Sequence, residues 1–179
     1  MSITGEAIIG GVHERGAGGS FKAWDPALRD YLEPSFHMVD AGQIDRACSL
    51  AGAAFDSFRA TTDAQRARFL DTVAEQIMLL GDELIERAMA ESGLPRARLE
   101  GERGRTCGQL RMFAELLREG SWIDARLDTA LPERTPPRPD LRYHLVGVGP
   151  VAVFAASNFP LAFSVAGGDT ASAFAAGCP

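Results

Sequence analysis

The sequence predicts an α/β fold in which a series of amphipathic helices precedes the first strand and helix of a parallel sheet. Between residues 44 and 119, apolar side chains recur at spacings of three and four, which is typical of helices with one buried face. Residues 145–179 contain one charged side chain, Asp169, and include a near-continuous apolar run, as expected for a strand covered on both faces. A proline-rich stretch, residues 131–139, separates the two parts.

The composition is that of an ordinary soluble globular protein and excludes several functions. The 179 residues are 46% hydrophobic and 23% charged. The chain carries 24 acidic and 18 basic side chains, and its net charge of -6 argues against nucleic acid as the main partner. Lys22 is the only lysine and no glycine scaffold surrounds it, which excludes a phosphate-binding loop of the G-x-x-x-x-G-K-[ST] type.

The cysteines and the first residues indicate the compartment. Cys48, Cys107 and Cys178 lie tens of residues apart, with no C-x-x-C and no Cys/His cluster. We therefore expect neither a metal site nor a disulfide framework, and a reducing compartment fits better. Residues 1–6 have no basic segment and no sustained apolar run, so we expect no secretory signal and a cytoplasmic protein.

The first two predicted parts are a group of short strands and a helix. Residues 7–39 alternate short apolar pieces with glycine and proline, which predicts short edge strands and turns. An amphipathic helix follows, because one stripe of it is formed by Ile44, Ala47, Cys48, Ala51, Phe55 and Phe58. On that stripe Cys48 is predicted to be a small buried hydrophobe rather than a nucleophile.

Two further helices have clear boundaries in the sequence. One helix begins at a capping box, whose first residue is Thr62, and this helix ends at Gly81. The next covers residues 82–92, with Asp82 as its predicted N-cap and Gly93 as its stop signal.

The last predicted helix of this series, residues 96–119, is rich in charge and glycine. Its interior glycines, Gly101, Gly104 and Gly108, each cost about 1 kcal/mol relative to alanine, so the helix needs tertiary packing. Charged residues alternate along it and are interpreted as a solvated or interhelical face rather than as a carboxylate-pair active site: Glu100, Glu102, Arg103 and Arg105.

The C-terminal part predicts a linker, a strand, a turn and a helix. Residues 131–139 form a linker or crossing segment, and residues 141–145 alternate as a strand does. Residues 148–156 read as a buried strand and residues 161–176 as an apolar helix with Pro160 at its first position. Glycines and prolines divide this part into pieces too short to span a membrane. Because the strand lacks a parallel partner, we expect either a longer chain or sheet partners from another chain.

The turn between that strand and that helix is where ligands bind in open α/β sheets. Asn158 lies in it. Its side chain fits two roles: a cap of the following helix, which the spacing alone favours, or an amide that donates to a developing oxyanion. The G-x-G at residues 147–149 precedes the strand, so it is not a dinucleotide fingerprint.

Residues 147–161, GVGPVAVFAASNFPL, resemble the strand and N-F-P-L turn of the NAD(P)-dependent aldehyde dehydrogenase superfamily. Further segments agree with the family in the same order: WDP at 24–26, QRARFL at 65–70, ESGLP at 91–95 and AAGCP at 175–179. Within the family, residues 163–172 resemble the α-ketoglutaric semialdehyde (2,5-dioxopentanoate) dehydrogenase branch.

The resemblance implies an aldehyde dehydrogenase-like fold, of which this chain holds the N-terminal helical segment and the beginning of a Rossmann-like sheet. Residues 1–130 then supply strands and helices of the cofactor domain, residues 131–146 a proline-rich crossing segment and strand, and residues 147–179 the first strand, turn and helix of the dinucleotide-binding sheet. It further implies oxidation of an aldehyde with NAD or NADP through a cysteine thiohemiacetal, in a homo-oligomer of dimeric or tetrameric type.

The resemblance also assigns roles to residues. Asn158 matches the oxyanion donor. Phe154, Ala155 and Ser157 match positions along the cofactor. Phe159 and Phe163 match positions along the aldehyde tunnel, and a role as core aromatics is equally open for these two. The nucleophilic cysteine and the general-base glutamate of the family fall beyond Pro179, and none of the present cysteines replaces that nucleophile. The alternative is a non-catalytic fragment or interaction module.

Overall fold

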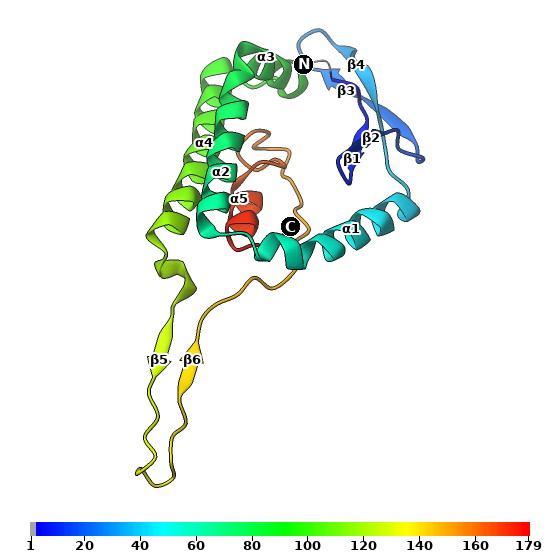
Figure 1. The fold of residues 1–179 in the computed structure, drawn as a ribbon. Helices are drawn as coiled ribbons and strands as arrows, with labels where there is room; N and C mark the ends of the chain where they lie inside the picture. Colours follow the sequence, from blue (N-terminus) through cyan, green and yellow to red (C-terminus); the bar gives the residue numbers. More distant parts are fainter. Residues whose placement is uncertain (1–2) are drawn as a thin grey trace.

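The computed structural model describes residues 3–179. Residues 1–2, part of the segment 1–6 for which we expect no secretory signal, lie outside the described part. Along the described residues, two antiparallel hairpins are followed by four helices and a 3₁₀ turn, then by a third hairpin and a last helix (Figure 1). The elements are β1 (Ala7–Ile9), β2 (Val12–Glu14), β3 (Ser20–Asp25), β4 (Asp30–His37), α1 (Ala41–Arg59), α2 (Asp63–Leu79), α3 (Gly81–Ser92), α4 (Arg96–Glu119), the 3₁₀ turn η1 (Ser121–Ile123), β5 (Arg126–Asp128), β6 (Leu141–Tyr143) and α5 (Gly168–Ala175).

The N-terminal residues form two hairpins, as the alternation of apolar pieces with glycine and proline predicts. β1 pairs with β2, and β3 pairs with β4. The buried carboxylate of Asp25 accepts hydrogen bonds from the backbone N–H groups of Ala27 at 2.8 Å and Leu28 at 3.0 Å. These bonds close the turn between β3 and β4, because they satisfy backbone donors that no strand pairs.

The core lies between α2 and α4, with α5 packed on both (Figure 1). Its buried members come from these three helices: Ala67, Leu70, Ala74, Cys107, Leu110, Ala114, Leu117, Ala171 and Ala175. The predicted bounds of α4 are confirmed. A Cβ built on any of its three interior glycines meets nothing within 4 Å, so these glycines are not sites of close helix contact.

The α2 capping box is confirmed, and α3 differs from the prediction at its start. Thr62 and Gln65 form the reciprocal bonds of the capping box. α3 begins at Gly81 after Leu80, which makes no side-chain cap bond, so the prediction of Asp82 as N-cap is wrong. Asp82 lies in the first turn, where its carboxylate opposes the positive helix end and accepts a bond from Arg96 at 2.7 Å. Gly93 ends the helix in the left-handed conformation, as predicted.

The helix α1 is confirmed, but the burial of its apolar stripe is not. Cys48 is exposed, which corrects the prediction of a buried hydrophobe. The helix spans from the N-terminal hairpins to the α2 and α5 end of the molecule (Figure 1). It touches α5 through Phe58, whose ring meets Phe174 at 5.6 Å. Near its start α1 contacts the β1–β2 hairpin, where Arg46 pairs with Glu14, whereas Ile44 on the apolar stripe is 52% exposed.

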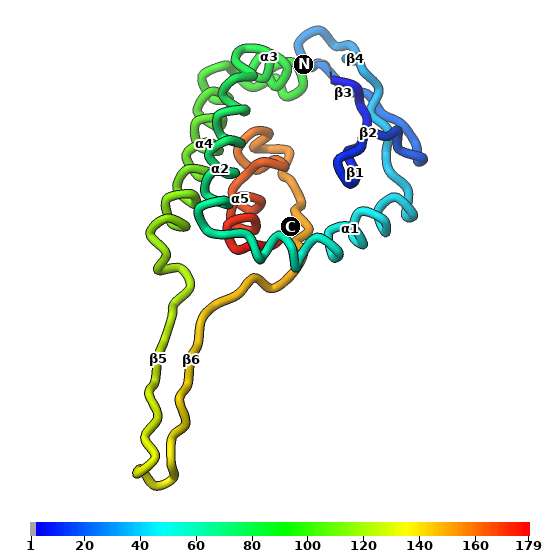
Figure 2. Tube along the Cα trace, in the orientation of Figure 1, coloured from blue at the N-terminus to red at the C-terminus, as the bar shows by residue number. Residues whose placement is uncertain are grey.

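The proline-rich segment is the end of a hairpin rather than a crossing linker. β5 and β6 pair in antiparallel fashion, and the hairpin projects from the body as a long arm (Figure 2). The strand predicted at residues 141–145 is confirmed over Leu141–Tyr143. Beyond the strands, Leu131 and Arg138 form an isolated bridge, and Arg138 donates to the carbonyl of Thr129 at 2.9 Å. The prolines thus lie where the chain reverses.

The C-terminal part departs most from the prediction. Residues 148–156 form no strand ladder with any described residue, and the final helix begins at Gly168 instead of residue 161. Val151 donates to the carbonyl of Pro179 at 2.9 Å and Ala156 to that of Phe163 at 2.9 Å, so this extended segment is held near its start and at its end. Strand structure requires a neighbouring strand, and none lies beside it in residues 3–179. Within the same residues no helix is long and apolar enough to cross a membrane.

Candidate active site

The turn after the extended segment is closed by its own backbone. Phe163 donates to the carbonyl of Phe159 at 3.0 Å, and Ala156 donates to the carbonyl of Phe163 at 2.9 Å. A weaker bond of 3.4 Å joins the N–H of Phe159 to the carbonyl of Ala156. Residues 156–163 therefore form a compact loop that contains a single helical turn, with Asn158 at its beginning.

A buried carboxylate on α4 holds this loop. Glu102 is only 5% exposed, and its Oε2 accepts hydrogen bonds from the N–H groups of Leu161 at 3.1 Å and Ala162 at 3.3 Å. Its Oε1 accepts from Arg98 Nε at 2.7 Å. Thr106 donates to the carbonyl of Leu161 at 2.6 Å. The interpretation of Glu102 as part of a solvated or interhelical charged face is therefore wrong, because this side chain bonds a loop rather than solvent or another helix.

These bonds explain why the predicted helix starts late. The N–H groups of Leu161 and Ala162 are bound to Glu102, and the Leu161 carbonyl is bound to Thr106. In a continuous helix that carbonyl would accept from Val165. Side chains of α4 replace the intrahelical partners, and a regular helix forms only after Gly167, its N-cap.

Asn158 does not cap the following turn, which corrects the preference derived from spacing. An Asn cap at 158 would bind the N–H of residue 160 or 161; Pro160 has none, and that of Leu161 is bound to Glu102. The Asn158 carbonyl accepts from Arg98 Nη2 at 3.2 Å. Within residues 3–179 its side-chain amide makes no hydrogen bond, and the residue is exposed. The amide is thus available to a ligand.

A cleft lies beside Asn158, between the loop and α3. It has a volume of about 570 Å³ and is lined on one side by Ser157, Asn158, Pro160 and Leu161. The opposite side is formed by residues of α3 and the segment that follows it: Leu84, Arg87, Ala88, Glu91, Ser92 and Leu94. The cleft therefore joins an available amide donor to a partly apolar wall.

The two aromatic residues of the loop pack together and against α4. The rings of Phe159 and Phe163 meet edge to face, with centroids 5.3 Å apart. An arginine covers each ring: the Arg98 guanidinium lies 4.6 Å from the Phe159 centroid, and that of Arg105 lies 4.7 Å from the Phe163 centroid. The assigned role at the aldehyde tunnel stays a prediction beside the role in packing.

Of the three predicted cofactor residues, Phe154 and Ala155 lie on the segment before the loop, and Ser157 lies near the start of the loop. Ala155 and Ser157 are exposed, and Phe154 is 91% exposed. Ser157 is next to Asn158 in the cleft, whereas the other two lie outside its lining. Their role along a cofactor stays a prediction.

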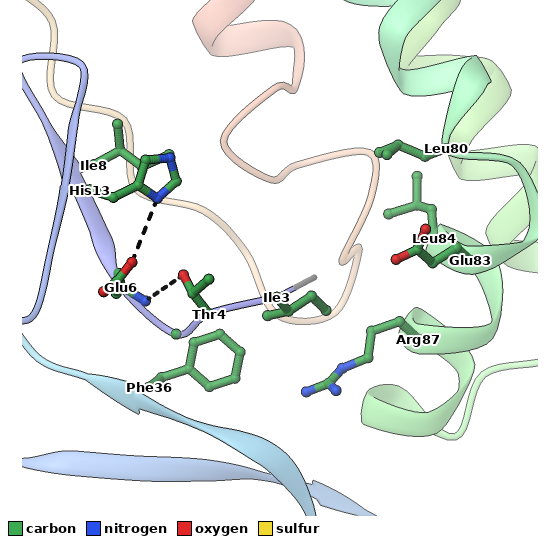
Figure 3. A pocket seen from close by; sticks show the side chains of 11 residues that line it. Ile3, Thr4, Glu6, Ile8, His13, Phe36, Leu80, Glu83, Leu84 and Arg87 are labelled. Atoms are coloured by element: carbon green, nitrogen blue, oxygen red, sulfur yellow. Dashed lines mark hydrogen bonds and ion pairs between the residues drawn. The ribbon is translucent and has the colours of Figure 1, made fainter. Parts of the chain in front are cut away.

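A second hollow, which shares Leu84 and Arg87 with this cleft, is lined by no residue predicted for catalysis. Ile3, Ile8 and Phe36 of the N-terminal segments face α3 and the end of α2, from which Leu80 and Leu84 contribute (Figure 3). His13 Nδ1 and Glu6 Oε2 are 3.9 Å apart at its edge. No group of three or more His, Cys, Asp or Glu side chains able to hold a metal occurs in the described part of the chain.

The residues that the sequence analysis missed are Glu102, Arg98 and Thr106. They recur every four residues on α4 and share one helix face. Glu102 also follows Leu99 by three positions and precedes Leu110 by eight, so it falls in the apolar pattern of that helix. A charged residue at a core-facing position was the signal that could have identified it.

A comparison with protein families agrees with this fold. The model of the family described as "Aldehyde dehydrogenase family" matches residues 13–179. The chain therefore belongs to the aldehyde dehydrogenase family.

Two curated relatives of this chain are both named as α-ketoglutaric semialdehyde dehydrogenases. The chain is 56% identical over 181 residues to "Alpha-ketoglutaric semialdehyde dehydrogenase 2" of Azospirillum brasilense, covering 100% of this chain and 34% of that protein. It is 59% identical over 160 residues to the "Alpha-ketoglutaric semialdehyde dehydrogenase" of Acinetobacter baylyi, covering 89% and 30%. The chain thus spans about a third of the length of the curated relatives it matches.

Solved structures share the fold. The succinate-semialdehyde dehydrogenase of Burkholderia pseudomallei aligns with a TM-score of 0.80 and 28% identity, over 97% of this chain and 34% of that chain. The arrangement of hairpins, helices, arm and loop is therefore that of the corresponding third of an aldehyde dehydrogenase.

Proposed function

We propose that this chain supplies the oxyanion donor and one wall of the cofactor site in an enzyme that oxidises α-ketoglutaric semialdehyde to 2-oxoglutarate with NAD or NADP. The observation that carries the proposal is the unpaired Asn158 amide, which lies beside a cleft on a loop held by α4. The substrate is suggested by the names of the two curated relatives. Because the chain spans about a third of their length, we propose that it acts within a longer polypeptide.

In this proposal, Asn158 acts through its side-chain NH₂. When a thiolate attacks the aldehyde carbon, negative charge develops on the carbonyl oxygen, and a donor already fixed in place stabilises that charge. The donor needs no reorientation, since the backbone of its loop is bound to α4. Phe159 and Phe163 would form an apolar wall for the carbon chain of the aldehyde.

The thiolate itself comes from outside this chain in our proposal. Cys107 is buried in the core, and burial raises the pKa of its thiol, so it is a poor nucleophile. Cys178 is buried as well. Cys48 is exposed, but α1 contributes no residue to the cleft beside Asn158.

The cofactor wall would be the end of the extended segment, with Phe154 and Ala155, and the start of the loop, with Ser157. All three are exposed, so this surface is open to a dinucleotide, while the backbone groups of residues 152–155, which have no partner within residues 3–179, fit pairing with a further strand of a longer polypeptide. NAD or NADP bound there would supply a hydride acceptor for the thiohemiacetal that the thiolate and the aldehyde form. Of these three residues Ser157, beside Asn158, would lie nearest to the reacting carbon.

The proposal is tested by removing the amide. In the complete dehydrogenase, Asn158→Ala lowers kcat by about 10²-fold or more, as loss of one oxyanion donor does. The rate is followed by the absorbance of reduced nicotinamide with α-ketoglutaric semialdehyde as substrate. The matched control is Gln76→Ala, which removes an exposed amide from α2 and leaves kcat unchanged. Wild-type turnover in Asn158→Ala would refute the assigned role.

The second candidate is an interaction module without catalysis. Large apolar side chains near the C-terminal part are strongly exposed, with Val148 at 92%, Phe154 at 91% and Val165 at 80%, and such a surface needs a partner. A purified 179-residue chain with a cooperative thermal transition and no turnover supports this candidate. A chain that is molten or aggregated alone supports the role within a longer enzyme. Size measurements of that enzyme test the dimer or tetramer implied by the family.

A further inference from the structure

We propose that Glu102 is a positioning residue for the Asn158 amide, acting through the loop that it holds. This inference rests on the proposed function, because it concerns how the oxyanion donor is held in place. It assigns a role to a buried carboxylate that itself neither reaches the cleft nor lies among its lining residues.

The hydrogen bonds around Glu102 compensate for the loss of water from its charged carboxylate. A carboxylate that is 5% exposed loses most of its hydration, which is unfavourable unless hydrogen bonds replace the water. Here the bonds come from two backbone N–H groups of the loop and from Arg98. The carboxylate thus stabilises one conformation of residues 161–162, since another conformation would leave a buried charge without donors.

Arg98 extends this control to Asn158 itself. Its Nε donates to Glu102 at 2.7 Å, while its Nη2 donates to the Asn158 carbonyl at 3.2 Å. Its guanidinium also covers the ring of Phe159 at 4.6 Å. A planar guanidinium holds its donors in fixed relative directions, so fixing one end fixes the other. The carboxylate therefore reaches both ends of the loop, directly at Leu161 and through Arg98 at Asn158.

Loss of Glu102 should consequently reduce catalysis more than cofactor binding. A displacement of about 1 Å of a catalytic group is enough to lower the rate by about 10²-fold. The oxyanion exists only in the transition state and the tetrahedral intermediate, so misplacing its donor lowers kcat and changes KM for NAD or NADP little.

The test compares single and double variants of the complete dehydrogenase. Glu102→Ala lowers kcat by about 10²-fold, and Glu102→Gln, whose amide oxygen can still accept from the loop, lowers it by about tenfold or less. If Glu102 acts through Asn158, the double variant Glu102→Ala/Asn158→Ala has a kcat within about threefold of Asn158→Ala alone, because groups that act as a unit are not additive. The matched control is Glu100→Gln, which changes an exposed carboxylate on the same helix and leaves kcat unchanged.

Two results would overturn the inference. One is a multiplicative loss of about 10⁴-fold in the double variant, which would show that Glu102 acts independently of Asn158. The other is wild-type kcat in Glu102→Ala. If Glu102→Ala does not fold, the same cycle is measured with Glu102→Gln, and non-additivity with Asn158→Ala remains the deciding result. A normal rate in Asn158→Ala would instead refute the proposed function, so the two failures are distinguishable.

Discussion

The buried arginine of α2 gives a stability prediction that the structure defines closely. Arg66 has a side chain that is 6% exposed. Its Nε donates to the carbonyl of Ala175 at 3.1 Å, and its Nη1 donates to that of Thr61 at 2.6 Å. It also pairs with Asp63, and its guanidinium lies 5.9 Å from the ring of Trp122. One side chain therefore joins the beginning of α2 to the last turn of α5.

Arg66→Lys keeps the positive charge but removes the planar, forked arrangement of N–H donors. A lysine ammonium is a point charge on a flexible stem and cannot reproduce the fork that spans both carbonyls. A hydrogen bond to a charged group contributes roughly 1.5–3 kcal/mol, so losing the Ala175 contact alone lowers the free energy of unfolding by about 2 kcal/mol. Arg66→Ala removes the donor from both carbonyls and the cation from the partly exposed Asp63, which keeps its bond from Trp122, and we expect a loss of about 2–4 kcal/mol.

The assay is urea unfolding followed by circular dichroism, in which the midpoint falls while the denaturant slope stays constant. The matched control is Arg68→Lys, which lies on the same helix with an exposed side chain and changes stability by less than about 0.5 kcal/mol. The reasoning is refuted if Arg66→Lys unfolds at the wild-type midpoint, or if the control loses as much stability.

Two further predictions follow from burial and backbone conformation. A thiol reagent labels Cys48 rapidly and Cys107 only on unfolding. Because burial raises the pKa of the Cys107 thiol, the fold favours its neutral form, and the free energy of unfolding falls as the pH rises past the usual thiol range. Cys107→Ala makes this fall smaller. Gly93→Ala lowers the unfolding free energy by about 1 kcal/mol or more, since φ is 68° there and the new Cβ would lie 2.9 Å from Pro26. Thermal melts measure this loss. The control Gly101→Ala, at an open helical position, does not destabilise the protein.

The helices could be predicted from the sequence because their signals are local. The capping box at Thr62, the stop at Gly93 and the periodicity of residues 96–119 all act within a few neighbours. Residues 148–156 differ in kind, since a strand is defined by pairing with another strand, and the apolar pattern contains no information on whether that partner is present. The same holds for Cys48, which is exposed although it lies on an apolar stripe, because periodicity does not state which positions a partner covers.

The site was predictable in part for a similar reason. The position of Asn158 at a turn after an apolar segment is a local feature, and the structure places it beside a cleft. The choice between its two roles depends on which groups compete for the N–H donors of the next turn. That competitor, Glu102, lies 56 positions earlier in the chain, on a helix whose packing against the turn no local pattern states.

The same contact accounts for the freedom of the Asn158 amide. A short polar side chain at the start of a helical turn ordinarily binds the N–H groups of the next residues, and its amide is then committed to the backbone. In this loop Pro160 has no N–H to offer, and Glu102 binds that of Leu161 from a neighbouring helix, with a charged acceptor that forms stronger bonds than an amide oxygen does. The carboxylate thus both fixes the backbone beneath Asn158 and takes the N–H group that would otherwise hold its side chain. The oxyanion role that we propose for Asn158 requires both a rigid backbone and an uncommitted amide, and a buried residue of α4 contributes to each.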